Sequence, residues 1–506
     1  MSTVTRVIKN TIFLYVKMGV TIVVSLYSTR LVLQALGASD FGLFTLVGGA
    51  IGMMGFLNST MANATQRYMS YAEGEGIITN KLKVFNISIL LHILIALITL
   101  VLFIGAYFPL FDTVFNIEPN RINAAKVLYF SFVISTCFTI TTVPYEAVLN
   151  AHENMLYYSL VGIIESFFKL AIAFACMKFG GDKLILYGAL MACIPIFSWT
   201  VMRIYCRSHY NECTVDSKYW DLNLIKEIAS FSGWNFLTAI TYLLSGQGIS
   251  IVLNYFFGTK INAAYGISQQ VNSQLSAFAE NMKKALYPVI VKSAGSNNDE
   301  SMNHAALMGC KYSSLLTVFF GVPLVIEMPY VLKLWLNIYP DWTVDFCRLQ
   351  LFFLLVTQLT SSLATSIYAK GNIKNYTICK SITNLAPIGV AYLCFRFGMD
   401  PIALFIPYIL IWGLGGNFII IYYAKRNCRV VVKDYIRVVL VPILFITILM
   451  IVSGSIICFS ILPSFGRLLV TCLTTTVVMV IGLWLFGLNR TEKSLIKGFL
   501  QKLFHI

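Results

Sequence analysis

The sequence predicts an all-α integral membrane protein with about fourteen transmembrane helices. Two observations lead to this fold class, the composition and an internal repeat. Hydrophobic residues make up 58% of the 506-residue chain, charged residues make up 12%, and the mean hydropathy is +0.77. These values are typical of a polytopic membrane protein.

The repeat relates the first half of the chain to the second. The segment LGASDFGLFTL around Gly37 is similar to FGTKINAAYGI around Gly258, 221 residues later. At the same shift, YAEGEG around Gly74 is similar to KSAGSN around Gly295, and farther along MKFGGD matches FRFGMD at a shift of 218 residues. Two related halves in one membrane chain are typical of transporters, whose substrate sites form where the halves meet.

Each predicted span is an apolar run of at least the roughly 20 residues needed to cross a hydrocarbon core of about 30 Å. The predicted spans cover about residues 10–36, 41–70, 83–110, 123–150, 155–179, 184–206, 228–257, 261–290, 304–333, 347–369, 376–398, 402–424, 436–461 and 466–488. The first run could be a signal peptide. Because Lys17 interrupts it and no small-residue cleavage site follows, we expect a retained helix instead.

These spans predict four parts of the chain. We expect a six-helix lobe at 1–210, a cytoplasmic linker with an amphipathic helix at 211–227, a second six-helix lobe at 228–425, and two additional spans with a basic tail at 426–506. No segment between spans is long enough to form a soluble catalytic domain. We therefore expect no catalytic residues and no enzymatic activity.

The net charge of +15 is best explained by membrane topology. Most Lys and Arg residues lie in alternate loops, on the side of both termini, which places the termini in the cytoplasm. The basic excess therefore indicates topology and attraction to anionic membrane lipids, and no nucleic-acid partner is expected. The twelve cysteines include no CxxC pair and no Cys/His cluster, so we expect no disulfide framework, metal site or cofactor.

Polar residues inside the predicted spans form stripes at helical spacing. The stripes are Lys17, Thr21, Ser25 and Ser28 in the first span, Ser59, Asn63, Gln66 and Arg67 in the second, Asn235, Thr238, Tyr242 and Ser245 in the seventh, and Gln270, Ser273, Glu280 and Lys284 in the eighth. An ionised side chain at the bilayer centre costs about 3 kcal/mol or more, so such groups should face a cavity or a partner. Because the stripes occupy equivalent places in the two halves, they predict a hydrophilic, net cationic vestibule between the halves.

Each polar residue also has a purely structural interpretation. Arg67, Lys283 and Lys284 lie near span ends, where long side chains snorkel to the interface. We expect Glu165 and Lys169, four residues apart, to neutralise each other, and His92 to be a hydrogen-bonded core histidine.

The N-terminal sequence adds a family resemblance. The segment VIKNTIFLYVKMGVTIVVSLYSTRLVLQALGASDFGLFTLVGG, followed by FLNSTMANATQRYMSYAEG, resembles Wzx-type polysaccharide transporters, the O-antigen flippases of the multidrug/oligosaccharidyl-lipid/polysaccharide (MOP) exporter superfamily. The rest of the chain resembles them mainly in topology. The resemblance implies a MATE-like pair of six-helix lobes around a cationic central cavity. It also implies alternating access, which moves polyprenyl-diphosphate-linked oligosaccharide from the cytoplasmic to the periplasmic face of the bacterial inner membrane, for O-antigen, lipopolysaccharide or capsule synthesis.

The substrate implied by the resemblance assigns roles to the polar stripes. Diphosphate requires cationic partners, and a glycan requires amides and hydroxyls. The candidate diphosphate ligands are Lys17, Arg30, Arg67 and Lys284, and the candidate sugar contacts are Asn63, Gln66, Asn235 and Gln270. Glu280, which lies among cations, is the candidate coupling residue.

Three other functions remain open. A multidrug exporter of the same fold should have an acidic cavity for cationic drugs, but the first span has no lone carboxylate at its centre. A membrane glycan polymerase or ligase should have a large periplasmic catalytic loop, and the outer loops are short. A peptidoglycan-precursor flippase would share the mechanism. We expect a monomer, with membrane lipids around it and with a polysaccharide polymerase or glycosyltransferases as candidate partners.

Overall fold

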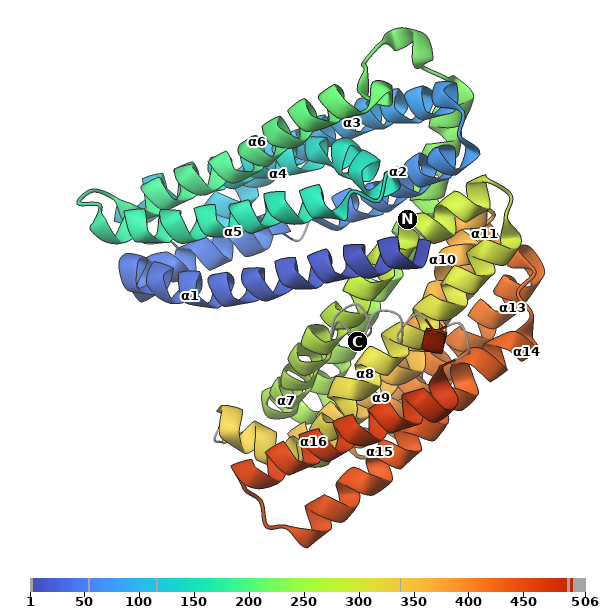
Figure 1. The fold of residues 1–506 in the computed structure, drawn as a ribbon. Helices are drawn as coiled ribbons and strands as arrows, with labels where there is room; N and C mark the ends of the chain where they lie inside the picture. Colours follow the sequence, from blue (N-terminus) through green and yellow to red (C-terminus); the bar gives the residue numbers. More distant parts are fainter. Residues whose placement is uncertain (1–2, 53–54, 115–116, 337, 489–491, 495–506) are drawn as a thin grey trace, which may run out of the picture. The chain divides into compact units, whose positions relative to one another are not determined.

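The computed structural model describes residues 3–52, 55–114, 117–336, 338–488 and 492–494, and within these ranges the regular structure is entirely helical (Figure 1). The longer helices are α1 (Thr3–Gly52), α2 (Gly55–Glu75), α3 (Ile78–Pro109), α4 (Ile122–Ala151), α5 (Met155–Lys178), α6 (Lys183–His209), α7 (Leu222–Gly295), α8 (Asp299–Leu336), α9 (Thr343–Gln358), α10 (Ser361–Lys370) and α11 (Lys374–Arg396). They are followed by α12 (Phe405–Pro407), α13 (Gly416–Cys428), α14 (Val432–Tyr435), α15 (Val441–Ser460) and α16 (Phe465–Gly482). The all-α fold class is confirmed.

The chain folds into two compact units. Unit 1 comprises Met1–Ala239 and Val291–Asn298, and unit 2 comprises Ile240–Ile290 and Asp299–Ile506. The segment predicted as a linker, residues 211–227, lies in unit 1 and contains two short 3-10 turns, Asn211–Cys213 and Ser217–Tyr219, and its last six residues are the first turns of α7. Asp221 caps α7 by accepting hydrogen bonds from the backbone N–H groups of Asn223 and Leu224. Most of the predicted basic tail, from residue 495 onward, lies outside the described residues.

By length and hydropathy, the described residues contain fewer candidate membrane-crossing helices than the fourteen predicted. Among the described residues, eleven helices are long and apolar enough to cross a membrane, and a twelfth span is possible where α9 and α10 meet at a bend of 41°. The count of fourteen is therefore not confirmed. The described residues of the two remaining predicted spans, at 41–70 and 261–290, are helical, but these spans contain two of the polar stripes, which lower their hydropathy.

The backbone shows the sequence repeat directly. Gly37 in unit 1 has φ 76° and ψ 172°, and Gly258 in unit 2 has φ 73° and ψ −173°. Only glycine adopts this backbone region without a steric penalty. Each glycine interrupts an otherwise continuous helix at the position that the 221-residue shift makes equivalent. The repeat therefore preserves a break in the helix as well as a sequence pattern.

Unit 1 is built around two helix pairs. Helix α4 packs along α6, and α1 packs along α5 (Figure 1). Its core includes the fully buried side chains of Val47, Leu128 and Tyr129, and the Tyr129 hydroxyl donates a hydrogen bond to the carbonyl oxygen of Phe103 at 2.7 Å. Because lipid is as apolar as these side chains, close packing and buried hydrogen bonds stabilise such a core more than burial itself does.

In unit 2, α15 and α16 pack against α8 and are fastened to it by an ion pair near one end. The fully buried carboxylate of Glu327 on α8 accepts hydrogen bonds from Arg467 at 2.7 Å and from Thr471 at 3.0 Å, both on α16. Toward the other end of α8, Lys311 donates to both carboxylate oxygens of Glu492 at 2.8 Å. The helices that follow the twelve repeated spans are thus an integral part of unit 2.

Two glycines related by the repeat allow a close helix crossing within unit 1. A Cβ atom on Gly74 of α2 would overlap the backbone carbonyl of Lys292, and a Cβ atom on Gly295 would overlap that of Tyr71. Tyr71 and Lys292 are themselves 221 residues apart. The contact is therefore reciprocal, and each repeat contributes the same glycine to it.

We expect Gly74→Ala to destabilise the protein by about 1–3 kcal/mol, because the added methyl group would overlap rigid backbone. The unfolding temperature of the purified protein in detergent should fall by several degrees, and Gly295→Ala should have a similar effect. Gly105→Ala, on α3 with open space around its Cβ position, is the matched control and should not lower it. A Gly74→Ala variant as stable as the wild type would contradict the close crossing.

Candidate functional site

A polar cluster lies inside unit 1 between α1, α5 and α6. The Lys17 ammonium of α1 lies 3.8 Å from the centroid of the Tyr158 ring on α5, which is a cation–π contact. Gly162, one turn farther along α5, leaves room for the Lys17 side chain, since a Cβ atom there would overlap it. The sequence predicted that Lys17 faces the central cavity, and the structure shows it in contact with Tyr158 and Gly162 of α5.

Hydroxyl groups extend this cluster along the same helices. The hydroxyls of Thr21 on α1 and Ser166 on α5 are 3.1 Å apart, and Ser198 on α6 donates a hydrogen bond to Glu165. Among the ion pairs of the described residues, Glu165 and Lys169 are not joined, which differs from the expected pair. Glu165 is instead oriented toward α6. Three helices thus direct a cation, a carboxylate and several hydroxyls into one region of unit 1.

His92 is a core histidine, as the sequence predicted. It is 1% exposed, and its Nδ1 atom lies 2.8 Å from the carbonyl oxygen of Ser88. This contact, one turn back along α3, explains the residue as part of the helix packing.

Arg67 on α2 is buried among aromatic rings. Its guanidinium carbon lies 4.5 Å from the centroid of Tyr68 and 4.7 Å from that of Phe231 on α7, and the residue is 5% exposed. The Tyr68 hydroxyl donates a hydrogen bond of 3.0 Å to Glu227. Arg67 therefore joins α2 to α7 within unit 1, which favours a packing role over the predicted open cavity position.

The remaining candidates of unit 1 vary in exposure. Arg30 and Asn63 are exposed, while Gln66 and Asn235 are half-buried. Ser245 of unit 2, from the predicted seventh-span stripe, is fully buried and donates to the carbonyl oxygen of Asn384 at 2.7 Å. That stripe therefore does not present a single exposed face.

The second half of α7, in unit 2, carries a continuous polar strip. All four residues predicted to share this face are exposed, and we call them the α7 strip: Gln270, Ser273, Glu280 and Lys284. Apolar residues between them, such as Leu275 and Ala279, are buried. Glu280 forms an ion pair with Lys283 and its side chain is 52% exposed, so the coupling candidate lies beside a cation, as predicted.

One further membrane-embedded cation was not among the predicted site residues. Lys380 on α11 is half-buried in unit 2, and a Cβ atom on Gly416 of α13 would overlap its ammonium. The sequence could have revealed this residue as a candidate, because Lys380 interrupts the predicted span at 376–398 just as Lys17 interrupts the first.

Three metal-capable side chains that the sequence patterns did not single out meet at one end of unit 1. Glu73 lies near the end of α2, His152 follows α4, and Glu212 follows α6, and their ligand atoms lie within 4.8 Å of one another. His152 Nε2 is 2.5 Å from Glu212 and its Nδ1 is 3.5 Å from Glu73, while Lys81 pairs with Glu73 at 2.6 Å. Each ring nitrogen of His152 faces a different carboxylate, so these residues form a polar clasp between helix ends.

The clasp also lowers the pKa of one of its own members, Glu212. Burial alone would raise the pKa of the Glu212 carboxyl, but hydrogen bonds from His152 and from a backbone N–H outweigh burial and hold this pKa below its ordinary value. Glu212 therefore stays ionised in the folded protein. The sequence could not show the clasp because its members lie on three separate helix ends.

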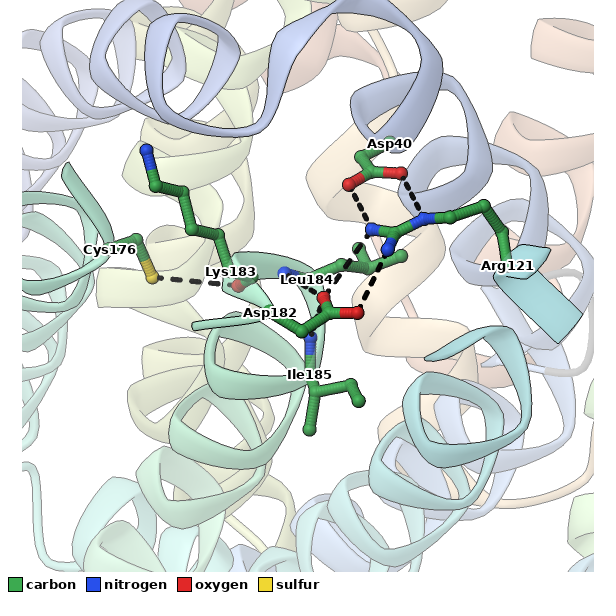
Figure 2. A network of polar contacts seen from close by, with 7 residues as sticks. All are labelled: Asp40, Arg121, Cys176, Asp182, Lys183, Leu184 and Ile185. Carbon is green, nitrogen blue, oxygen red and sulfur yellow. Dashed lines mark hydrogen bonds and ion pairs between the residues drawn. The ribbon is translucent and has the colours of Figure 1, made fainter. Parts of the chain in front are cut away.

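A second charged cluster fastens the opposite ends of the helices of unit 1. Figure 2 shows Arg121, at the start of α4, between the carboxylates of Asp40 on α1 and Asp182 before α6. Arg121 donates to Asp40 at 2.9 Å and to Asp182 at 2.8 Å. Asp182 also caps α6 by accepting from the backbone N–H of Leu184 at 3.0 Å. Unit 1 is therefore held at both ends by charged residues.

Comparison with solved structures identifies the fold. The structure is similar to the crystal structure of a MATE point mutant (TM-score 0.72, 13% identity, covering 84% of this chain and 96% of that one). It is also similar to an outward-facing multidrug resistance MATE family transporter of the MOP superfamily (TM-score 0.67, 13% identity, 84% and 95% covered). A third similar structure is a MOP superfamily transporter from Pyrococcus furiosus, described as having a binding pocket of reverse polarity that suggests a different function (TM-score 0.69, 11% identity, 85% and 96% covered).

The sequence comparisons give no match. Neither a protein-family model nor a curated protein sequence matches this chain. At these identities the structural likeness shows the fold alone. The MATE-like fold expected from the N-terminal resemblance is confirmed.

We expect Arg121→Ala to lower stability by about 1–3 kcal/mol, because it leaves two neighbouring carboxylates without their cation. The unfolding temperature should fall by several degrees. Arg396→Ala is the control: it removes the same charge from an exposed position on α11 and should change the unfolding temperature little. Equal effects of the two substitutions would show that Arg121 does not join α1, α4 and α6.

Proposed function

We propose that this protein is a membrane transporter that moves polyprenyl-diphosphate-linked oligosaccharide across the bacterial inner membrane by alternating access. The fold supports a transporter, because the similar solved structures are MATE and MOP transporters. In this proposal both termini lie in the cytoplasm, and the glycan moves to the periplasmic face for O-antigen or capsule synthesis. The protein acts as a monomer, with polymerase and glycosyltransferases as candidate partners.

The α7 strip carries the proposal. It combines an amide, a hydroxyl, a carboxylate and a cation on one exposed face of a helix, the carboxylate is paired with Lys283, and apolar residues on the same helix are buried. Such a face suits a ligand that has both an anionic diphosphate and hydroxyl-rich sugars. We assign diphosphate contact to Lys284, and sugar contact to Gln270. Asn63, Gln66, Asn235 and Arg30 remain candidate contacts of unit 1.

The embedded cations support an anionic substrate. Lys17 and Lys380 occupy helices that are apolar enough to cross a membrane, where an ionised side chain is costly unless it serves packing or function. The contacts of Lys17 and Arg67 with aromatic rings favour a positioning role for both. In this proposal the positive charge of Lys380 opposes a cationic drug.

A multidrug exporter is the second candidate, because one of the similar structures is a multidrug resistance transporter. The fold fits both functions equally. The Pyrococcus furiosus transporter, whose pocket polarity is described as reversed, illustrates that pocket polarity differs among MOP transporters. We therefore choose between the two functions by the charge of the polar residues, which favours an anionic glycolipid over a cationic drug.

Transport of the glycolipid should depend on Lys284. In proteoliposomes loaded with polyprenyl-diphosphate oligosaccharide, accessibility of the glycan to an external glycosidase measures movement across the bilayer. We expect Lys284→Ala to slow this movement at least tenfold, which corresponds to about 1.4 kcal/mol. The control Lys433→Ala removes an exposed lysine of unit 2 away from the strip and should leave the rate unchanged.

The same vesicles also test the second candidate function. If wild-type vesicles do not move the glycolipid but export a cationic dye, the multidrug function is correct and the proposal is wrong.

Glu280 is the proposed coupling residue, because it is an exposed carboxylate paired with Lys283 on the α7 strip. We expect Glu280→Gln to abolish the acceleration of transport by an imposed proton gradient while glycolipid binding remains intact, since the amide cannot titrate. Gradient-driven transport at the wild-type rate in Glu280→Gln vesicles would refute this role.

A further inference from the structure

A cavity in unit 1 is lined by none of the candidate substrate-binding residues. It has a volume of about 400 Å³ and is lined by α3, α4 and α6. Ile89 and Ile93 of α3, Phe138 of α4 and Trp199 of α6 form apolar walls, and Arg203 and Arg207 of α6 complete the lining. This volume is in the range of small-molecule binding sites.

The two arginines lie on one face of α6, because they are four residues apart. Arg203 is half-buried, with its guanidinium carbon 4.7 Å from the centroid of Trp199, and Arg207 is exposed. Within the described part of the chain, neither arginine forms an ion pair with an acidic side chain. The groove therefore carries two guanidinium groups whose charge the protein does not neutralise.

Both arginines lie near the C-terminal end of α6. Helix α6 ends at His209, so at a rise of about 1.5 Å per residue Arg203 lies about 9 Å and Arg207 about 3 Å from the helix end. This is the end that the charge pattern predicts to be cytoplasmic. From there the apolar walls continue toward the middle of the span.

The outer surface of the same helices is apolar. Ile93 on α3 is 46% exposed, and Phe130 and Ile134 on α4 are 45% and 46% exposed. These side chains suit contact with acyl chains. The groove thus combines a hydrocarbon-facing wall with a pair of cations at one end, which is the charge and polarity pattern of an anionic lipid.

We propose that unit 1 binds an anionic phospholipid in this groove. Arg203 and Arg207 hold the phosphate, which guanidinium groups recognise through paired hydrogen bonds, and Ile89, Phe138 and Trp199 contact an acyl chain. The ligand is a lipid of the surrounding bilayer and not the transported molecule. The proposed lipid site therefore does not depend on the proposed transport function.

The test is lipid binding to the full-length purified protein, measured by native mass spectrometry with phosphatidylglycerol and phosphatidylcholine. We expect phosphatidylglycerol to bind more tightly, and the double variant Arg203→Gln/Arg207→Gln to weaken that binding at least tenfold. The charge-matched control, Lys9→Gln/Lys226→Gln, removes two exposed cations of unit 1 elsewhere and should change it less than twofold. Equal weakening by both double variants would mean a diffuse charge effect and would overturn the proposal.

Further binding measurements distinguish this lipid site from a site for free phosphate and from the transport path. Ile89→Trp should narrow the groove and weaken binding without changing charge, so an unchanged affinity in this variant would overturn the acyl-chain contact and the proposal with it.

Glycerol 1-phosphate should fail to displace bound phosphatidylglycerol. If glycerol 1-phosphate displaces it as effectively as phosphatidylglycerol itself does, the groove is a site for free phosphate. If polyprenyl-diphosphate oligosaccharide displaces the phospholipid and loses affinity in the arginine variant, the groove belongs to the transport path and the phospholipid proposal is wrong.

Discussion

Charged groups within a hydrocarbon layer need partners, and both units of this protein are organised around that requirement. In unit 2 the fully buried Glu327 is matched by Arg467 and Thr471, which ties α16 to α8. In unit 1 Lys17 is matched by the face of Tyr158, with Gly162 providing the space. Removing either Arg467 or Glu327 would leave a buried charge, which costs far more than the pair contributes.

The same requirement separates structural polar residues from functional candidates. Arg67, Ser245 and Glu327 are buried and have packing neighbours, so each is explained by how it joins helices. The α7 strip is different, because Gln270, Ser273, Glu280 and Lys284 are exposed together although buried apolar residues lie between them. An exposed polar face of this kind needs water or a polar ligand, which is why the proposed substrate contacts begin there.

The sequence was informative where a pattern is local or repeated. Helical periodicity predicted the shared face of the α7 strip, and the 221-residue repeat predicted equivalent positions that proved to be helix breaks at Gly37 and Gly258. It could not reveal contacts between distant helix ends, such as Glu73 with His152 and Glu212, because neither spacing nor hydropathy encodes them. Arg67 shows a further limit: a cation at stripe spacing can stack on aromatic rings, and only the packing of α7 decides this.

The central claim is that the polar residues recognise an anionic, lipid-linked glycan. The most direct measurement is equilibrium binding to the purified protein of three ligands: polyprenyl-diphosphate oligosaccharide, the same oligosaccharide without its lipid diphosphate, and a cationic dye. We expect the first to bind most tightly and added salt to weaken its binding, because the charge interaction is screened. Tight binding of the dye, together with no binding of the glycolipid, would contradict the claim.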